Sequence, residues 1–396
     1  MIGISKLYCG TVEPSDPLRY GRNSQNLPSH LLQFSRDKKP VIVWNITRRC
    51  NLSCVHCYSQ SENRNYQGEL TTDQGLALLD DLAQFGVPVV LFSGGEPLLR
   101  DDLCILIEHA RSLGLRAVIS TNGTLIDRAQ AEQFAQIGLS YVGISLDGMR
   151  ETNDKFRGRQ GAFDAALAAI RHCQKAGVKV GLRFTINRRN VADISDIFKL
   201  LIDENIPRAC FYHLVYAGRG SRLMRDDLDH NQTRNVVDLI IDRTAEMHRQ
   251  NLPKEVLTVD NHADGPYLYL RLLREGQTER AEQVMRLLQM NDGNSSGIGI
   301  GCVSWDGSVH PDQFWRHHSF GNVRERKFSE IWTDVSDPLM AKLKDRKPYL
   351  KGRCAACRFI SVCNGNFRVR AEAAADNLWA PDPACYLTDD EITLNE

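Results

Sequence analysis

Three cysteines near the start of the chain have the spacing of a metal-binding loop. Cys50, Cys54 and Cys57 follow one another in the pattern C-x3-C-x2-C. Three close thiolates can hold three corners of a [4Fe–4S] cluster and leave one iron without a protein ligand. A structural zinc site needs a fourth ligand close by, and His56 could supply it only from a strained loop. The spacing therefore favours an iron–sulfur cluster with one open iron.

A second cysteine group lies near the C-terminal end of the sequence. Cys354, Cys357 and Cys363 are followed by Cys385, so four thiolates are available in a loop-rich region. Spacing alone leaves zinc and an iron–sulfur cluster as equal alternatives, because C-x2-C pairs are common in zinc ribbons. The chain has 12 cysteines. Such clustering in a reducing compartment indicates metal or redox chemistry rather than disulfides.

The composition excludes several classes of protein. Lys+Arg and Asp+Glu are both 49, so the formal net charge is zero, which argues against a dedicated nucleic-acid binder. No apolar run reaches the length of a membrane span, and residues 1–10 contain no stretch typical of a signal peptide. We therefore expect a cytoplasmic protein with neither a nucleic-acid nor a membrane partner.

Alternating strand and helix patterns must position the first cysteine group. Short apolar runs predict strands at 41–45, 87–92, 117–120, 141–145, 178–184 and 209–213. Amphipathic stretches predict helices at 76–85 (capped by Thr72), 101–113, 127–137, 162–176 and 192–204. Such repeated units imply a parallel sheet, and six are too few for a closed eight-stranded barrel. We expect an α/β fold with a partial, open (β/α)6 TIM-like barrel, whose site lies at the carboxyl ends of the strands.

Four segments are expected along the chain. Residues 1–39 show little periodicity and are interpreted as an N-terminal extension, and residues 40–220 form the barrel core. Residues 221–290 are interpreted as a helical connection, with helices at 228–250 and 266–290. Residues 291–396 are rich in loops and hold the second cysteine group, so we expect a separate metal-binding domain there.

The first cysteine loop resembles that of the radical S-adenosylmethionine (SAM) superfamily. Gly94, Gly95 and Glu96, one predicted strand later, resemble the glycine-rich motif of that family. In the family, the open iron binds the amino and carboxylate groups of SAM, and electron transfer releases a 5′-deoxyadenosyl radical that takes hydrogen from the substrate. The resemblance implies that Cys50 and its two partner cysteines are catalytic as well as metal-binding.

The same resemblance implies a set of SAM contacts. The residues from Gly94 to Glu96 would bind the amino group of the methionine moiety, and His56 holds the place of an aromatic residue that contacts the adenine. Polar residues at the ends of the next two strands resemble those that face the ribose and carboxylate of SAM. They are Ser120, Asn122, Ser145 and Asp147, and Arg157 could pair with the carboxylate. Turns and helix caps are the alternative interpretation for these polar residues.

The C-terminal region resembles the SPASM/Twitch extension, which carries auxiliary [4Fe–4S] clusters. The full SPASM pattern has cysteines for two such clusters, but Asp312 and Phe367 stand at two of the cysteine positions. The resemblance therefore implies one auxiliary cluster, with Cys354, Cys357, Cys363 and Cys385 as its ligands. The expected cofactors are two [4Fe–4S] clusters and SAM. Because four thiolates leave no open iron, we expect the auxiliary cluster to transfer electrons.

The wider resemblance covers Lys39 to Tyr386 and is nearest to radical SAM enzymes that modify tetrapyrroles, above all the NirJ type of haem d1 biosynthesis. It rests on residues 43–50 and 302–315. It implies 12,18-didecarboxysiroheme as the substrate, from which two propionates are removed and replaced by oxo groups. The first alternative is a haem-synthesis decarboxylase of the siroheme pathway. The second is a SPASM peptide-maturing enzyme, although residues 1–39 leave little room for its peptide-binding domain. The third is a non-catalytic metal protein, which would not need Gly94–Glu96.

A macrocycle with several carboxylates needs cationic donors and apolar faces. The candidate substrate residues are His213, Cys302, His310, Trp315 and Arg316, and further arginines near strand ends are Arg183, Arg188, Arg189 and Arg219. An ordinary core or surface role is the alternative for each histidine, and a buried structural thiol is the alternative for Cys302. A small electron donor such as flavodoxin or ferredoxin is the expected protein partner.

Overall fold

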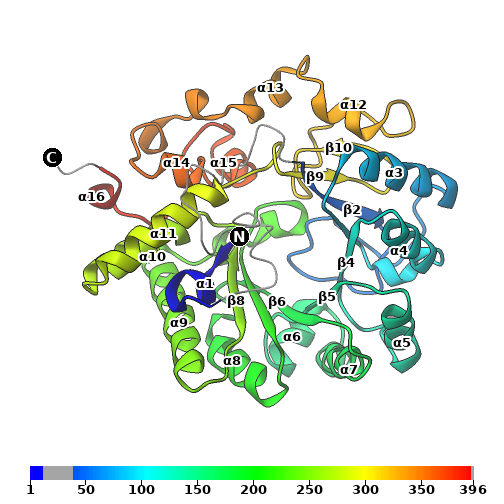
Figure 1. The fold of residues 1–396 in the computed structure, drawn as a ribbon, viewed down its shortest axis with the longest axis horizontal. Helices are drawn as coiled ribbons and strands as arrows, with labels where there is room; N and C mark the ends of the chain where they lie inside the picture. Colours follow the sequence, from blue (N-terminus) through cyan, green and yellow to red (C-terminus); the bar gives the residue numbers. More distant parts are fainter. Residues whose placement is uncertain (12–38, 394–396) are drawn as a thin grey trace.

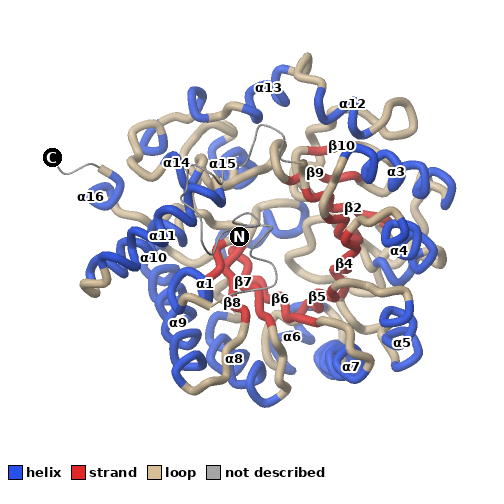
Figure 2. Tube along the Cα trace, viewed as in Figure 1, coloured by secondary structure: helices blue, strands red, loops and turns tan. Residues whose placement is uncertain are grey.

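The computed structural model describes residues 1–11 and 39–393. One ten-stranded sheet forms its centre, in the order β1-β8-β7-β6-β5-β4-β3-β2-β9-β10. Strands β2 to β8 are each parallel to the next. They are β2 (Val41–Thr47), β3 (Val89–Gly94), β4 (Arg116–Thr121), β5 (Tyr141–Ser145), β6 (Val180–Ile186), β7 (Arg208–His213) and β8 (Glu255–Val259). Figure 1 and Figure 2 show these strands as an open arc with helices on its outside, which confirms the expected partial barrel.

The helices between the strands cover the outer face of the arc (Figure 1). They are α3 (Thr72–Phe85), α4 (Leu103–Ser112), α5 (Arg128–Gln136), α6 (Arg150–Arg157), α7 (Ala162–Lys175) and α8 (Ile194–Asp203). Helix α3 begins at Thr72, the predicted cap, because the actual N-cap is Thr71, which makes a capping box with Gln74. The side chain of Thr72 instead donates to Asp102 at 2.7 Å.

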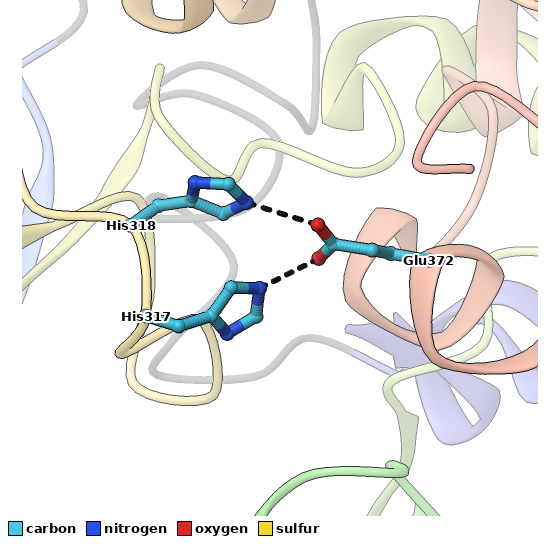
Figure 3. Close-up of side chains that lie close together, drawn as sticks. All are labelled: His317, His318 and Glu372. Atoms are coloured by element: carbon cyan, nitrogen blue, oxygen red, sulfur yellow. Dashed lines mark hydrogen bonds and ion pairs between the residues drawn. The ribbon is translucent and has the colours of Figure 1, made fainter. Parts of the chain in front are cut away.

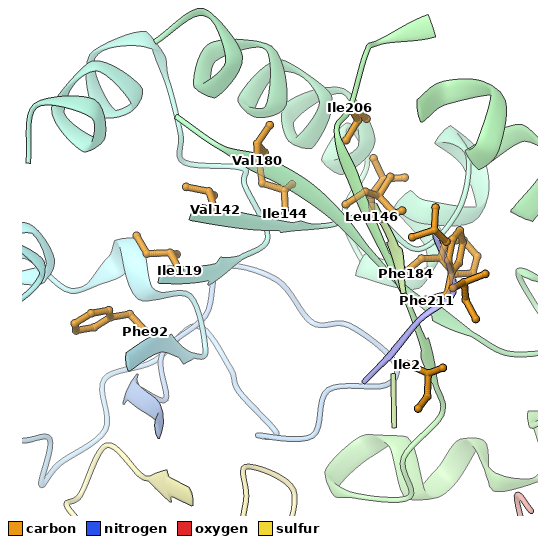
Figure 4. Packing of buried hydrophobic residues seen from close by; sticks show 14 of the residues in the cluster. Ile2, Phe92, Ile119, Val142, Ile144, Leu146, Val180, Phe184, Ile206 and Phe211 are labelled. Atoms are coloured by element: carbon orange, nitrogen blue, oxygen red, sulfur yellow. The ribbon is translucent and has the colours of Figure 1, made fainter. Parts of the chain in front are cut away.

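The hydrophobic core lies between the sheet and the outer helices. Figure 4 shows strand residues such as Phe92, Ile119 and Phe184 within this cluster. Side chains alternate between the two faces of a strand, so that in β4 Ala117 and Ile119 are buried in the core, whereas Ser120 is partly exposed. The inner face of the arc is therefore free to carry polar side chains.

The sheet extends beyond the predicted core on both sides. β1 (Ile2–Gly3) pairs antiparallel with β8 and is followed by α1 (Ile4–Cys9), so part of the predicted extension has regular structure. β8 itself lies inside the predicted helical connection, between the helices expected at 228–250 and 266–290 and after α9 (His230–Arg249). The helix predicted at 266–290 is two helices, α10 (Asp264–Arg274) and α11 (Thr278–Asn291), because Gly276 adopts a positive φ of 73° between them. The four-segment division stays a prediction.

The C-terminal region closes against the opposite edge of the sheet. β9 (Ile300–Val303) runs parallel to β2, and β10 (Val309–His310) pairs antiparallel with β9. Short helices follow, namely α12 (Phe328–Thr333), α13 (Pro338–Lys344), α14 (Ile360–Cys363), α15 (Arg368–Ala375) and α16 (Asp389–Ile392). Figure 1 shows α14 and α15 beside the open side of the arc. Among the described helices, none is long and apolar enough to cross a membrane.

Candidate functional site

The first cysteine loop follows β2, at the carboxyl end of the sheet. Cys50, Cys54 and Cys57 pack together around Leu52. The backbone N–H of Leu52 donates to Cys50 Sγ at 3.4 Å, and the Cys57 sulfur lies 3.2 Å from Ser59 Oγ. Burial raises the pKa of Cys50 to about 12. A bound metal would supply the positive charge that stabilises thiolates at such a buried position.

The two glycines of the glycine-rich motif let β3 approach this loop. The backbone N–H of Gly95 donates to the Thr47 carbonyl at 2.8 Å, and that of Glu96 donates to the Arg49 carbonyl at 2.8 Å. A Cβ at Gly94 would lie 2.3 Å from the Thr47 carbonyl oxygen, and one at Gly95 would lie 2.1 Å from the Arg49 oxygen. Only glycine fits at either position, so the motif sets the course of the chain into Cys50.

Glu96 joins the ends of β3 and β4 beneath the cysteine loop. Its buried carboxylate accepts from Thr121 Oγ1 at 2.7 Å, from the Asn122 N–H at 2.9 Å and from the Leu98 N–H at 3.2 Å. Burial raises the pKa of Glu96 to about 7. Asn122 in turn donates to Asn51 Oδ1 at 2.8 Å, inside the cysteine loop. Two predicted SAM contacts, Glu96 and Asn122, thus also anchor the loop to the sheet.

Arg157 links a strand end to the first cysteine group. Its guanidinium forms a buried ion pair with Asp147 and donates to Cys54 Sγ at 3.6 Å. Asp147 also accepts from the Thr185 N–H at 2.7 Å. His56 Nε2 lies 3.6 Å from Asp147 Oδ2, and burial lowers the pKa of His56 to about 4, so its ring is neutral. The structure therefore brings Arg157, Asp147 and His56 together beside Cys54.

Several polar residues of the inner face were missed from the sequence. Tyr58, directly after the cysteine loop, donates to Asn45 Oδ1 at 3.0 Å and lies 3.2 Å from Ser93 Oγ. Asn45 donates to Cys302 Sγ at 3.4 Å, because β9 pairs with β2. A polar residue inside an apolar strand run was the available signal for Asn45. For Tyr58 the signal was only its position.

Arg183 is the cation of the inner face. It lies opposite Ser145 in the β5–β6 register, and its guanidinium stacks over the Tyr212 ring at 4.8 Å. Within residues 1–11 and 39–393, this guanidinium has no hydrogen-bond or ion-pair partner. The predicted residues Ser120 and Ser145 are partly exposed on neighbouring strands. The inner face therefore offers a cation that is stacked on the Tyr212 ring and partly exposed.

The other candidate substrate residues are largely engaged inside the protein. His213 is buried, and its Nε2 lies 2.9 Å from Asp264 Oδ2. Trp315 is fully buried and donates to Glu372. His310 is buried with Nδ1 2.8 Å from the His318 carbonyl. Arg316 stacks over Trp305 at 4.4 Å and donates to the Ser59 carbonyl at 2.8 Å, so it is the one of these four that reaches the cysteine loop.

The second cysteine group also comes together in space. Burial is the main reason that the pKa of Cys363 is raised. The nearby sulfurs of Cys385, Cys354 and Cys357 raise it further. Cys385 is reached through a long loop after α15, and Arg353 holds that loop by donating to the Cys385 carbonyl at 3.3 Å. The four residues are therefore neighbours despite the gap of more than twenty positions before Cys385.

The distances between the cysteine sulfurs bear on whether zinc is bound. Tetrahedral zinc with bonds of about 2.3 Å holds its thiolates about 3.8 Å apart. Among residues 1–11 and 39–393, neither cysteine group has three sulfurs within 4.8 Å of one another. No three of these sulfurs therefore stand already in the arrangement of one zinc ion's thiolates, within the described residues. An iron–sulfur cube holds its thiolate ligands further apart than a zinc ion does.

Comparisons with known proteins agree with this geometry. Residues 44–201 match the Radical SAM superfamily, and residues 300–358 match the SPASM iron–sulfur cluster-binding domain. An Fe-coproporphyrin III synthase from Methanosarcina barkeri is 68% identical over 100% of both chains. A pre-heme d1 synthase from Dinoroseobacter shibae is 44% identical over 88% of this chain and 87% of that protein. An AdoMet-dependent heme synthase from Oleidesulfovibrio alaskensis is 32% identical over 95% of each.

Solved structures share the fold at low sequence identity. Streptococcus suis SuiB bound to its precursor peptide SuiA matches with a TM-score of 0.71 at 18% identity, covering 88% of this chain and 76% of SuiB. The AdoMet-bound anSMEcpe matches with a TM-score of 0.67 at 19% identity, covering 87% and 93%. These confirm the predicted fold class. The family matches confirm the predicted cofactors, SAM and [4Fe–4S] clusters. The chain belongs to the radical SAM superfamily, as an enzyme with a SPASM domain that modifies tetrapyrroles.

Proposed function

We propose that this enzyme forms Fe-coproporphyrin III from a more highly substituted iron tetrapyrrole of the siroheme type. The observation that carries the proposal is the 68% identity, over the whole of both chains, to an Fe-coproporphyrin III synthase. This is the siroheme-pathway alternative that the sequence left open. The haem d1 step, with oxo groups in the product, is the second candidate, because a pre-heme d1 synthase is 44% identical over 88% of the chain.

We further propose which residues hold the cofactors. Cys50, Cys54 and Cys57 would hold the first cluster, and the four cysteines from Cys354 to Cys385 would hold the auxiliary one. When bound, the first cluster and SAM supply the radical that takes hydrogen from the substrate. The chain keeps a cation beside this group, since Arg157 donates to Cys54 Sγ. It also closes the loop over the sheet through Asn122 and Glu96.

An anaerobic turnover assay separates the two candidate functions. The reconstituted enzyme would be incubated with 12,18-didecarboxysiroheme, SAM and a reductant, and the extracted tetrapyrroles analysed by chromatography and mass spectrometry. We expect a product that coincides with Fe-coproporphyrin III and carries no oxo groups. A dioxo product would move the assignment to the haem d1 step. Formation of 5′-deoxyadenosine with the tetrapyrrole unchanged would reject both.

Arg183 is expected to bind a substrate carboxylate. Arg183 is partly exposed on the inner face and makes no hydrogen bond to the described residues, so its guanidinium is available to a bound carboxylate, and tetrapyrroles of this type carry several carboxylates. Hydrogen bonds to a charged group are worth about 1.5–3 kcal/mol. Arg183→Met should therefore raise the KM for the tetrapyrrole by about 10- to 150-fold, measured by steady-state product formation, while 5′-deoxyadenosine release without substrate is unchanged.

The control for this variant is Arg188→Met. The sequence also offered Arg188 as a carboxylate partner, but the structure pairs its guanidinium with Gln232 at 3.2 Å and places it 3.9 Å from Asp229, about half exposed, so its loss should leave KM within twofold. If Arg183→Met behaves like this control, Arg183 does not bind the substrate.

Two further expectations concern the setting of the enzyme. We propose a small electron donor such as flavodoxin or ferredoxin, since radical formation needs one electron from outside the chain. We also propose a cytoplasmic location, because the clustered thiols suit a reducing compartment.

A further inference from the structure

A group of potential metal ligands lies outside both cysteine groups. His317 and His318 follow β10, and both rings point at the carboxylate of Glu372 on α15 (Figure 3). His317 Nε2 lies 2.9 Å from Oε2, and His318 Nε2 lies 3.0 Å from Oε1. The two ring centroids are 4.4 Å apart. The group is accessible, with side-chain exposures of 59%, 28% and 21% in chain order.

The separations of these atoms match those around one metal ion. With bonds of about 2.0–2.1 Å, neighbouring ligand atoms lie about 3.0 Å apart in an octahedral site and about 3.4 Å apart in a tetrahedral one. The ligand atoms of His317, His318 and Glu372 all lie within 4.8 Å of one another. An ion could therefore enter with only small side-chain rotations.

We propose that His317, His318 and Glu372 bind one divalent transition-metal ion. Two imidazoles and one carboxylate suit zinc, iron, manganese and related ions rather than Mg²⁺ or Ca²⁺, and they leave coordination positions open for water. The iron of a tetrapyrrole does not fit, because its four equatorial positions are filled by the macrocycle and cannot accept three ligands from one side. The three side chains together are therefore assigned to a separate metal ion rather than to the iron of the substrate.

Neighbouring side chains make hydrogen bonds to two of these three residues, as they commonly do to the ligands of a metal site. The Trp315 indole donates to Glu372, and His310 contacts the His318 carbonyl at 2.8 Å. Such supporting contacts orient metal ligands and tune their affinity. The ion would tie the loop after β10 to α15. That loop also carries Arg316, which reaches the Ser59 carbonyl beside the first cysteine group, so the ion would steady this contact.

The test measures zinc on the chain with both clusters in place. The enzyme would first be reconstituted with iron and sulfide, treated with a chelator and desalted. It would then be mixed with a small excess of Zn²⁺ and passed through gel filtration to remove unbound zinc. The zinc and iron that remain on the protein would be measured. We expect about one zinc per chain more than in the chelator-treated enzyme before Zn²⁺ is added, with iron unchanged. The double variant His317→Ala/His318→Ala should lose this zinc and keep its iron.

Two further variants separate metal binding from folding. His109→Ala is the matched control, because His109 Nε2 pairs with Asp80 at 2.8 Å without a second histidine; it should retain the zinc. Trp315→Phe keeps all three ligands and should weaken zinc affinity by about 10- to 100-fold. Equal zinc on the wild type and the double variant would overturn the proposal, as would no zinc on either. In that case the three residues form a hydrogen-bonded ion pair without a metal.

Discussion

Replacing Cys50, Cys54 and Cys57 together with Ala is expected to lower the iron content from about eight to about four atoms per chain. It should also abolish 5′-deoxyadenosine formation. The three thiolates are the only protein ligands that we propose for the first cluster, and they form one packed cluster with Leu52. Iron and acid-labile sulfide assays, with electron paramagnetic resonance of the reduced protein, measure the remaining cluster.

The matched control is Cys104→Ala, since Cys104 belongs to neither group; its thiol accepts from Gln130 Nε2 at 3.7 Å and packs against the hydrophobic core. It should keep the full iron content and activity. The reciprocal variant, Cys385→Ala, should lower iron while 5′-deoxyadenosine is still released. Full iron content in the triple variant would show that these thiolates do not hold a cluster.

Arg370→Met is expected to destabilise the protein by about 3–5 kcal/mol, the usual effect of leaving one member of a buried ion pair alone. Arg370 and Asp382 are both fully buried and joined at 2.8 and 2.9 Å. The same guanidinium donates to the carbonyls of Leu214 and Asp260, at the ends of β7 and β8. It therefore fastens the loop that carries Cys385 to the barrel.

The free energy of unfolding would be measured by denaturant titration of the reconstituted protein. Arg243→Met serves as the control, because Arg243 and Glu246 form a pair in which each side chain is 43% exposed. Its effect should stay within about 0.5 kcal/mol. Equal destabilisation by the two variants would contradict the importance of the buried pair. A double variant, Arg370→Met/Asp382→Leu, should recover part of the loss because no lone charge remains.

The sequence predicted strands well where a short apolar run marks each of them. The strands from Val41 to His213 have apolar runs that only a buried parallel sheet explains, and the structure has a strand at each of the six. β8 was missed because its five residues Glu255–Val259 neither alternate nor form a long apolar run, and its place in the sheet follows from pairing with β1 and β7. The break at Gly276 was visible in the sequence, yet the leucine-rich stretch before it outweighed one glycine.

The site was harder to predict where a partner is distant in the sequence. The glycine-rich motif was expected to bind SAM. Its packing against Thr47 and Arg49 depends on two strand ends meeting. Trp315 was expected to face the substrate, but Glu372, more than fifty positions later, binds its indole and draws it inward. The spacing of residues along the chain does not predict contacts such as that between Trp315 and Glu372, since they depend on how the C-terminal region packs.

The pairing of β9 with β2 has a consequence for how the chain folds. Val43 lies opposite Cys302 in this parallel pair, so one edge of the barrel depends on a segment synthesised long after it. Contacts between such distant positions slow folding, and an unpaired strand edge is open to pairing with another chain. A nascent chain released before residue 303 would expose β2. Truncated forms of this protein should therefore aggregate rather than fold into a smaller enzyme.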